Sequence, residues 1–146
     1  MVAWFYLLVV AAGVSVALQQ LLNANLRSEL GSPWWAGFVS YLGGSLVMLL
    51  AVLANHGPWI TREMVARTSW PSWTGGLFGA AFIAIAIFMV PKLGAATVMT
   101  LLVVGQMMGS LVFDHFGLLG VPRHPINLSR VLGAGCLIIA VLLIRR

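Results

Sequence analysis

Charged side chains are scarce in this sequence of 146 residues. Only 8% of the residues are Asp, Glu, Lys or Arg, whereas a soluble domain carries about a quarter. Hydrophobic residues make up 61% of the chain. This balance excludes a separate soluble domain and predicts an integral membrane protein surrounded by lipids. The net charge of +5 does not indicate nucleic-acid binding, because the basic residues fall singly or in pairs between apolar runs, as anchors at lipid headgroups do.

Residues that commonly carry catalysis or bind metals are also few. Cys136 is the single cysteine and lies inside an apolar run, so no disulfide can form within the chain. His56, His115 and His124 all lie outside the apolar runs, where we expect solvated loops. No Ser/His, Asp/Asp, HExxH or Cys/His pattern occurs at membrane depth. The sequence therefore predicts no catalytic residues, no metal site and no cofactor, and argues against an enzyme.

Long apolar runs are what the sequence has instead. The N-terminal run lacks the basic start of a signal peptide and continues past the length of one, so we expect it to be retained as a membrane helix. Five runs predict an all-α fold, an integral membrane bundle of five transmembrane helices that forms a single membrane domain over 1–146. The expected helices cover about 2–26, 33–55, 72–90, 94–114 and 129–145, and Pro91-Lys92 is expected to end the third.

Several local signals mark where elements begin. Ser32-Pro33 is typical of a helix start, with serine as the N-cap and proline in the first turn. His56-Gly57-Pro58 predicts a turn. Thr61 is expected to cap a short interfacial helix that carries Arg62, Glu63 and Arg67. Tryptophans near the ends of runs suit an aromatic belt at the membrane surface, and the expected anchors are Trp34, Trp35 and Trp73.

Two predicted helices carry polar side chains at the same spacing. Positions i, i+4 and i+8 share one helix face. An amide in hydrocarbon is costly unless it is paired, so these faces should point inward. They either line a common substrate cavity or hold the bundle together by hydrogen bonds between helices. The candidate substrate pathway consists of Ser15, Gln19 and Asn23 in the first helix, Gln106, Ser110 and Asp114 in the fourth, and Tyr41 in the second.

Small residues form stripes beside these polar tracks. Such stripes let two helix backbones approach closely in a membrane. We expect helix packing at Ser40 and Gly44, Gly75 and Gly79, and Gly105 and Gly109.

Asp114 is the only acid near a predicted membrane core. A carboxylate at the C-terminal end of a helix opposes the helix dipole, so it needs a compensating partner. Arg123 and Arg130 are both candidates for this partner across the following loop.

Several short motifs together resemble a known family. They are Gln19, Gly75-Gly76-Leu77-x-Gly79, Gly94-Ala95-Ala96-Thr97, Gly105-Gln106, Asp114-x-Phe116-Gly117 and Gly120-Val121-Pro122. They are similar to the five-helix YdcZ-type branch of the drug/metabolite transporter superfamily, which consists of bacterial inner-membrane proteins. The resemblance spans essentially the whole chain. It places Gln19, Gln106 and Asp114 on the recurrent polar positions of the family, but the chain lacks the first-helix glutamate that four-helix multidrug exporters use for proton coupling.

The resemblance implies a secondary transporter of small molecules or metabolites in the bacterial inner membrane, built from units that pair. Five helices alone enclose little volume, so we expect alternating access in a homodimer or with a paired homologue. Five spans would leave four Lys or Arg residues on each side of the membrane. This balance allows dual topology with an antiparallel dimer, and the alternative is a single fixed topology in a parallel dimer or with a separate partner. The alternative is a non-transporting assembly or scaffold subunit.

Overall fold

The computed structural model describes residues 2–55, 57, 59–120 and 122–144, and these residues are mostly helical. They divide into two compact units, Met1–Lys92 and Leu93–Arg146, which are described separately below. The elements are α1 (Val2–Leu30), α2 (Pro33–Ala54), α3 (Arg62–Arg67), η1 (Trp70–Thr74), α4 (Gly75–Leu93), α5 (Ala95–Phe116), η2 (Leu118–Gly120) and α6 (Leu128–Ile144). The turn residues His56 and Pro58 and the cations Arg145 and Arg146 lie outside the described residues.

The first unit begins with two helices joined by a tight turn. Gly31 has φ +65°, a conformation that residues with a Cβ adopt at a cost. Ser32 then caps α2: its hydroxyl accepts a hydrogen bond from the Trp35 amide at 3.4 Å, and Pro33 occupies the first turn. The predicted start of this helix is therefore confirmed. The first helix continues to Leu30, four residues beyond its predicted end, which brings Arg27 inside α1.

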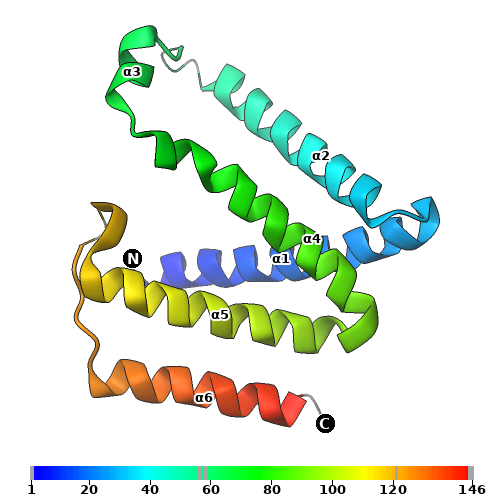
Figure 1. The fold of residues 1–146 in the computed structure, drawn as a ribbon, viewed down its shortest axis with the longest axis vertical. Coiled ribbons are helices and arrows are strands. Elements are labelled where there is room, and N and C mark those ends of the chain that lie inside the picture. Colours follow the sequence, from blue (N-terminus) through cyan, green and yellow to red (C-terminus); the bar gives the residue numbers. More distant parts are fainter. Residues whose placement is uncertain (1, 56, 58, 121, 145–146) are drawn as a thin grey trace. The chain divides into compact units, whose positions relative to one another are not determined.

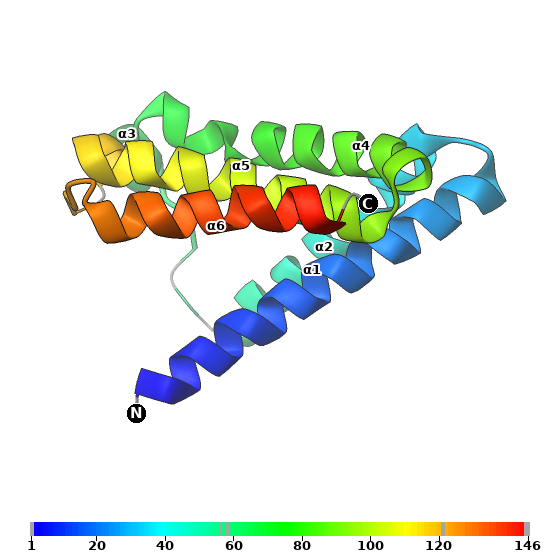
Figure 2. The same ribbon diagram turned by 90° about the horizontal axis from the view of Figure 1, so that it is seen from below.

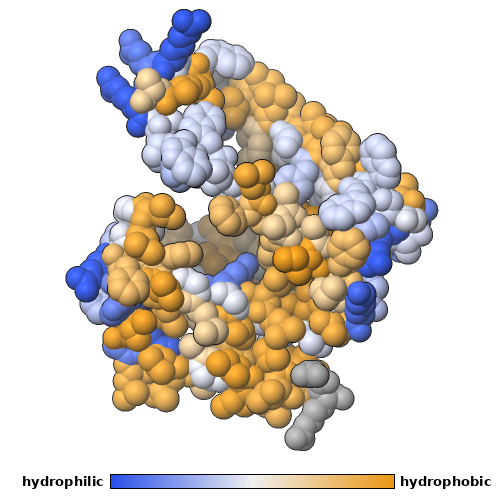
Figure 3. All heavy atoms as spheres, viewed as in Figure 1, coloured by the Kyte–Doolittle hydropathy of each residue, from blue (hydrophilic) through white to orange (hydrophobic). Residues whose placement is uncertain are grey.

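The segment between α2 and α4 contains the predicted interfacial helix, α3. The Thr61 hydroxyl accepts from the Met64 amide at 3.3 Å, which confirms Thr61 as the cap. The five-residue helix η1 follows and leads into α4. In Figure 3, hydrophilic side chains gather at α3, whereas hydrophobic side chains cover much of the surface of the long helices on this face.

The core of the first unit lies where α1, α2 and α4 come together. Ala36, Ile83 and Ile87 are buried there. Leu26, Tyr41 and Phe82 pack against them. A Cβ added at Gly37 would make ordinary van der Waals contact with this cluster, 3.7 Å from Cδ1 of Ile87. Figures 1 and 2 show that the three helices approach one another at the end that holds the α1–α2 turn.

Pro91 does not end its helix, contrary to the prediction. It lies inside α4, which continues to Leu93. A proline has no N–H, so the carbonyl of residue i−4 loses its helical hydrogen bond. That carbonyl belongs to Ile87, and Nη1 of Arg27 donates to it at 2.8 Å. The arginine of α1 therefore replaces the missing donor, and the free carbonyl has a partner inside the unit.

The second unit is an antiparallel hairpin of α5 and α6, which lie side by side in both views (Figures 1 and 2). Gly117 ends α5 in the left-handed conformation, with φ +62°. The Asn127 side chain accepts from the Arg130 amide at 3.0 Å at the start of α6. The connection between the helices is thus fixed by local hydrogen bonds at both ends.

Four helical segments of the described chain are long and apolar enough to cross a membrane. They are Ala3–Leu30, Pro33–Ala54, Trp70–Leu93 and Ala95–Phe116. The fifth predicted span corresponds to α6, which has 17 residues. At a rise of about 1.5 Å per residue it measures roughly 26 Å, somewhat less than the roughly 30 Å of a bilayer core. Four of the five predicted spans are therefore long enough to cross a membrane, and α6 is somewhat shorter.

Candidate functional site

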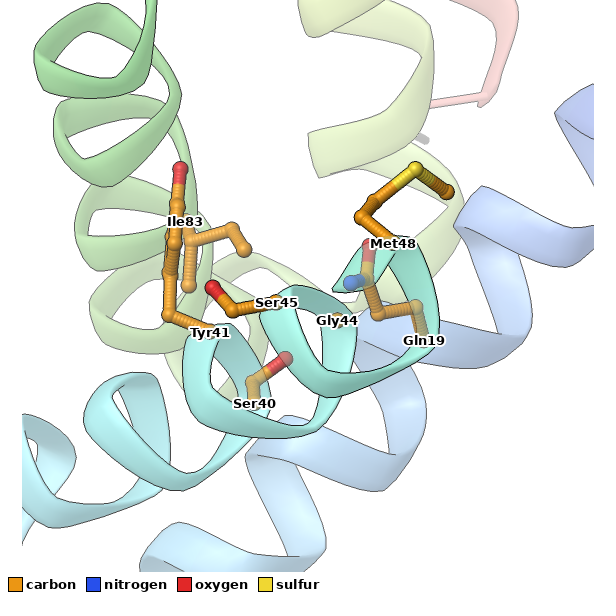
Figure 4. A pocket seen from close by; sticks show the side chains of 7 residues that line it. All are labelled: Gln19, Ser40, Tyr41, Gly44, Ser45, Met48 and Ile83. Carbon is orange, nitrogen blue, oxygen red and sulfur yellow. The ribbon is translucent and has the colours of Figure 1, made fainter. Parts of the chain in front are cut away.

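A pocket with a mostly apolar lining and a few polar groups opens among the helices of the first unit (Figure 4). Its volume is about 570 Å³. Gln19 comes from α1 and Ile83 from α4, and the remaining lining residues come from α2. The lining consists of Gln19, Ser40, Tyr41, Gly44, Ser45, Met48 and Ile83. One amide and three hydroxyl groups thus share a pocket whose other walls are apolar, a composition suited to a small amphipathic molecule.

Tyr41 connects this pocket to a second one. The neighbouring apolar pocket has a volume of about 280 Å³ and shares Tyr41 and Ile83 with the first. The position of the tyrosine ring depends on Gly79, because the Tyr41 hydroxyl occupies the place where a Cβ of residue 79 would stand. Gly79 thus accommodates a tyrosine side chain of the same unit, whereas the helix–helix packing expected there stays a prediction.

Two buried amides lie on α1. Gln20 is fully buried and Asn23 is 5% exposed. Nε2 and Oε1 of Gln20 and Nδ2 of Asn23 have no hydrogen-bond partner among the described residues. A buried polar group without a partner typically costs about 1–3 kcal/mol. The sequence pattern identified Asn23 but missed Gln20, because the i, i+4, i+8 spacing selects Gln19 instead of its neighbour.

Arg27 extends this polar region toward the end of α1. Besides its bond to the Ile87 carbonyl, its guanidinium carbon lies 5.4 Å from the ring centroid of Phe88. The Phe88 ring also packs edge to face against the Trp34 ring, with the two ring centroids 5.4 Å apart. The cation is thus positioned by a carbonyl and an aromatic ring of α4. Arg27 is part-buried and was not predicted as a site residue.

The predicted polar track of the second unit lines two separate hollows. Gln106 and Ser110 line a groove of about 470 Å³ along α5, together with Gly105 and Gly109. Ser110 and Asp114 line a pocket of about 290 Å³ between α5 and α6. The hydroxyl of Ser110 donates to the Met107 carbonyl at 2.9 Å, within its own helix. The idea that both predicted tracks face one common cavity stays a prediction.

Asp114 is paired with Arg130, one of its two predicted partners. Nη1 of Arg130 lies 3.1 Å from Oδ2 of Asp114, and the side chains are 33% and 28% exposed, respectively. The same nitrogen donates to the His124 carbonyl at 3.2 Å, and the His124 amide donates to the Asp114 carbonyl at 2.8 Å. This network compensates the carboxylate at the end of α5.

His115 differs from its predicted role as a solvated loop residue. It lies in the last turn of α5, where its Nδ1 accepts from the Ile126 amide at 3.2 Å and its carbonyl accepts from Nε of Arg123 at 3.0 Å. The other candidate partner of Asp114 therefore binds the histidine carbonyl instead. Both contacts hold the loop against the end of α5.

The remaining predicted residues lie on exposed surface or in local contacts. Ser15 is exposed on α1. A Cβ added at Gly75 or Gly105 would have no atom within 4 Å, so close packing there stays a prediction that needs a second helix. Gly44 also has open space and lines the pocket with Ser40. Trp35 packs edge-on against Phe38, and Nε1 of Trp73 donates to the Thr68 hydroxyl at 2.8 Å.

Comparison with known proteins assigns the chain to a family. Residues 4–143 match the family model described as "Putative inner membrane exporter, YdcZ". The chain belongs to the YdcZ family. It is 26% identical over 137 residues to the "Inner membrane protein YdcZ" of Escherichia coli (strain K12), an alignment that covers 94% of this chain and 91% of the relative. No solved structure matches the chain significantly.

Membership of the YdcZ family agrees with the apolar helices described above. The chain is a multi-pass protein of the bacterial inner membrane. The resemblance predicted from Gln19, the glycine motifs and Asp114 is therefore confirmed, and transport is the activity with which the YdcZ family is described.

Proposed function

We propose that this chain is a secondary transporter that exports a small molecule across the inner membrane. The observation that carries the proposal is the pocket of about 570 Å³ among α1, α2 and α4, which places an amide and three hydroxyls inside an apolar surround. Polar groups at membrane depth are costly and commonly mark solute pathways. The family description, an inner-membrane exporter, supports the same reading.

The lining suggests how such a pocket would hold a solute without trapping it. The Gln19 amide and the hydroxyl groups of Ser45 and Tyr41 would bind the polar part, while Met48 and Ile83 would contact the apolar part. Hydrogen bonds inside membrane proteins contribute only about 0.6–2 kcal/mol each. A few bonds of this size permit release as well as binding, which transport requires. The access to each side would alternate as the helices around the pocket rearrange.

We place five spans in the membrane, with α6 as the fifth, and two copies in the working transporter. The length of α6 supports a span because flanking residues can adapt to a shortfall of a few ångströms. Five spans put α3 and the α5–α6 loop on one side, so each side carries four cations. One side has Arg62, Arg67, Arg123 and Arg130, and the other has Arg27, Lys92, Arg145 and Arg146. This balance supports dual topology and an antiparallel homodimer.

Cysteine labelling tests the orientation. Ala66→Cys in α3, on a Cys136→Ser background, is treated in intact cells with a membrane-impermeant thiol reagent. We expect about half of the molecules to be labelled, and all of them after permeabilisation, because oppositely inserted copies expose α3 on opposite sides. Labelling of all or none in intact cells would establish a single orientation.

Export is tested by analysing the medium of growing cells. Cells that express the wild-type chain are compared with cells that express Gln19→Met and with cells that lack the protein, and small molecules in the medium are measured by mass spectrometry. We expect at least one solute to accumulate outside only with the wild type, because the variant removes the pocket amide. Leu18→Met, on exposed apolar surface of the same helix, is the matched control. Identical media would contradict export and favour the scaffold alternative.

A further inference from the structure

One face of α1 collects hydrogen-bond donors that the protein leaves largely unused. Gln20, Asn23 and Arg27 stand at i, i+3 and i+7, so their side chains share a face of the helix. Both amides are at least nine-tenths buried, and their nitrogens have no partner among the described residues. Native proteins pair almost all buried polar groups, so unpaired ones call for an explanation such as a ligand.

The charge of Arg27 is not balanced by any acid of the described chain. The chain has three acidic residues. Asp114 pairs with Arg130, Glu29 accepts from the Asn25 amide at 2.8 Å, and Glu63 lies in the exposed helix α3. Within the part of the chain that the structure describes, Arg27 forms one hydrogen bond, from Nη1 to the Ile87 carbonyl, whereas a guanidinium has five N–H donors. A full positive charge and several donors therefore remain available beside the buried amides.

The three side chains follow one another in depth along the helix. Arg27 lies three residues before the end of α1, and Gln20 lies ten residues before it. At about 1.5 Å per residue, Gln20 stands roughly 15 Å inside that end. A solute entering from this end would meet the cation first and the two amides next.

We propose that this face of α1 binds the carboxylate of the transported solute, which is a small organic acid that also carries a neutral O–H or N–H donor. The inference rests on the proposed transport function and names its substrate class. A guanidinium binds a carboxylate in a bidentate geometry that also supplies the opposite charge. The nitrogens of Gln20 and Asn23 add donors for an anion, and the unpaired Oε1 of Gln20 accepts from the second group of the solute.

An organic cation fits this face poorly. It would approach Arg27, which forms no salt bridge with an acid among the described residues, and burying like charges together is strongly unfavourable. A neutral amide would use the donors but gain nothing from the charge. The three kinds of solute should therefore bind in the order acid, amide, amine.

A matched series of probes tests this order without requiring transport. The purified protein in lipid nanodiscs is melted in the presence of lactate, lactamide or 1-amino-2-propanol, which share one carbon skeleton and one hydroxyl. Sodium chloride at the same ionic strength is the reference. Because a bound ligand stabilises the folded state, we expect lactate to raise the melting temperature by a few degrees, lactamide to raise it less and the amine to leave it unchanged. Equal shifts for the acid and the amine, a larger shift for the amine, or no shift with any probe would overturn the inference.

A charge placed on the same face provides the decisive variant. Asn23→Asp puts a buried acid one turn from Arg27, where an i, i+4 ion pair occupies the cation. We expect the lactate shift to disappear. Ser28→Asp adds the same charge on an exposed part of α1 and should keep the shift. A lactate shift that survives Asn23→Asp would contradict the site.

The melting and export experiments distinguish a failure of the carboxylate site from a failure of the proposed transport function. A protein that shows the lactate shift, and loses it in Asn23→Asp, but exports nothing would contradict the proposed transport and retain the carboxylate site. Export of an amine from the cells would contradict the substrate class and retain the transport.

Discussion

In the unit Leu93–Arg146 the charged side chains at the α5–α6 turn have partners, whereas in the unit Met1–Lys92 three polar atoms of the buried α1 amides have none among the residues that the structure describes. Asp114 pairs with Arg130, and His115 accepts from a backbone amide. Gln20 and Asn23 leave buried polar atoms unpaired. A satisfied network stabilises a hairpin, and an unsatisfied one costs stability unless a ligand completes it. We therefore expect the carboxylate of the solute to bind the unpaired amides of the first unit and not the paired charges of the second.

The largest expected loss of stability comes from breaking the satisfied network. Arg130→Met leaves the Asp114 carboxylate without its cation and removes the bond to the His124 carbonyl. Removing one partner of a fully buried pair costs about 3–5 kcal/mol, and an exposed pair is worth about 0–1 kcal/mol. With both side chains about a third exposed, we expect a loss of about 2 kcal/mol in the free energy of unfolding.

The double variant sharpens the role of Asp114. In Asp114→Asn/Arg130→Met the carboxylate and the cation are both gone, so most of the lost stability should return. If the role of Asp114 is only structural, the double variant should also recover export. Restored stability with no export would move Asp114 into the transport pathway and weaken the contrast between the units.

The contribution of the Arg27–Ile87 hydrogen bond to stability is expected to depend on Pro91. Arg27→Met leaves the Ile87 carbonyl unpaired and should cost about 1–2 kcal/mol. Pro91→Ala restores an N–H that can bond this carbonyl within the helix. In the Pro91→Ala background the same arginine substitution should therefore cost about 1 kcal/mol less. Unfolding measurements on the four proteins of the cycle give the coupling, and a coupling of zero would mean that the arginine does not replace the missing donor.

The smallest expected effect concerns the shape of the pocket in the first unit. A Cβ at Gly79 would collide with the Tyr41 hydroxyl, so Gly79→Ala should displace the ring and cost about 1 kcal/mol. Tyr41→Phe should relieve the collision. Gly76→Ala is the matched control, because a Cβ at that position would have no atom within 4 Å, and it should be neutral or slightly stabilising. Equal melting temperatures for Gly79→Ala and Gly76→Ala would contradict the contact.

Local signals predicted much of the fold because they act within one helical turn. Ser32 and Thr61 accept the hydrogen bonds expected of helix caps, and both helices start where these residues indicate. The spacing along α5 placed Ser110 and Asp114 in the same pocket. Such features depend on periodicity and side-chain chemistry, which a sequence contains explicitly.

The features that the sequence did not predict depend on contacts between residues that lie far apart in the chain. Nothing local to Pro91 indicates that an arginine 64 positions earlier serves the carbonyl that the proline leaves free, so the predicted end of the helix was too early. Gln20 was missed for a related reason. Gln19 and Gln20 are adjacent amides with the same chemistry, and only the packing of α1 determines which of them is buried. Periodicity identifies the residues that share a helix face, but it does not show which other helix packs against that face.

One measurement tests most directly the claim that α1 keeps its amides unpaired for a ligand. Gln20→Met replaces the buried amide by an apolar side chain of similar size, and the variant is melted without ligand beside the wild type. If the amide is unpaired in the empty protein, the substitution should raise the free energy of unfolding by about 1–2 kcal/mol, since it removes a buried polar group with no partner. Export by the same variant should fall about tenfold, which corresponds to the loss of roughly one hydrogen bond to the solute. A Gln20→Met protein that is less stable than the wild type, and exports normally, would mean that the amide holds the helices together and would contradict the account.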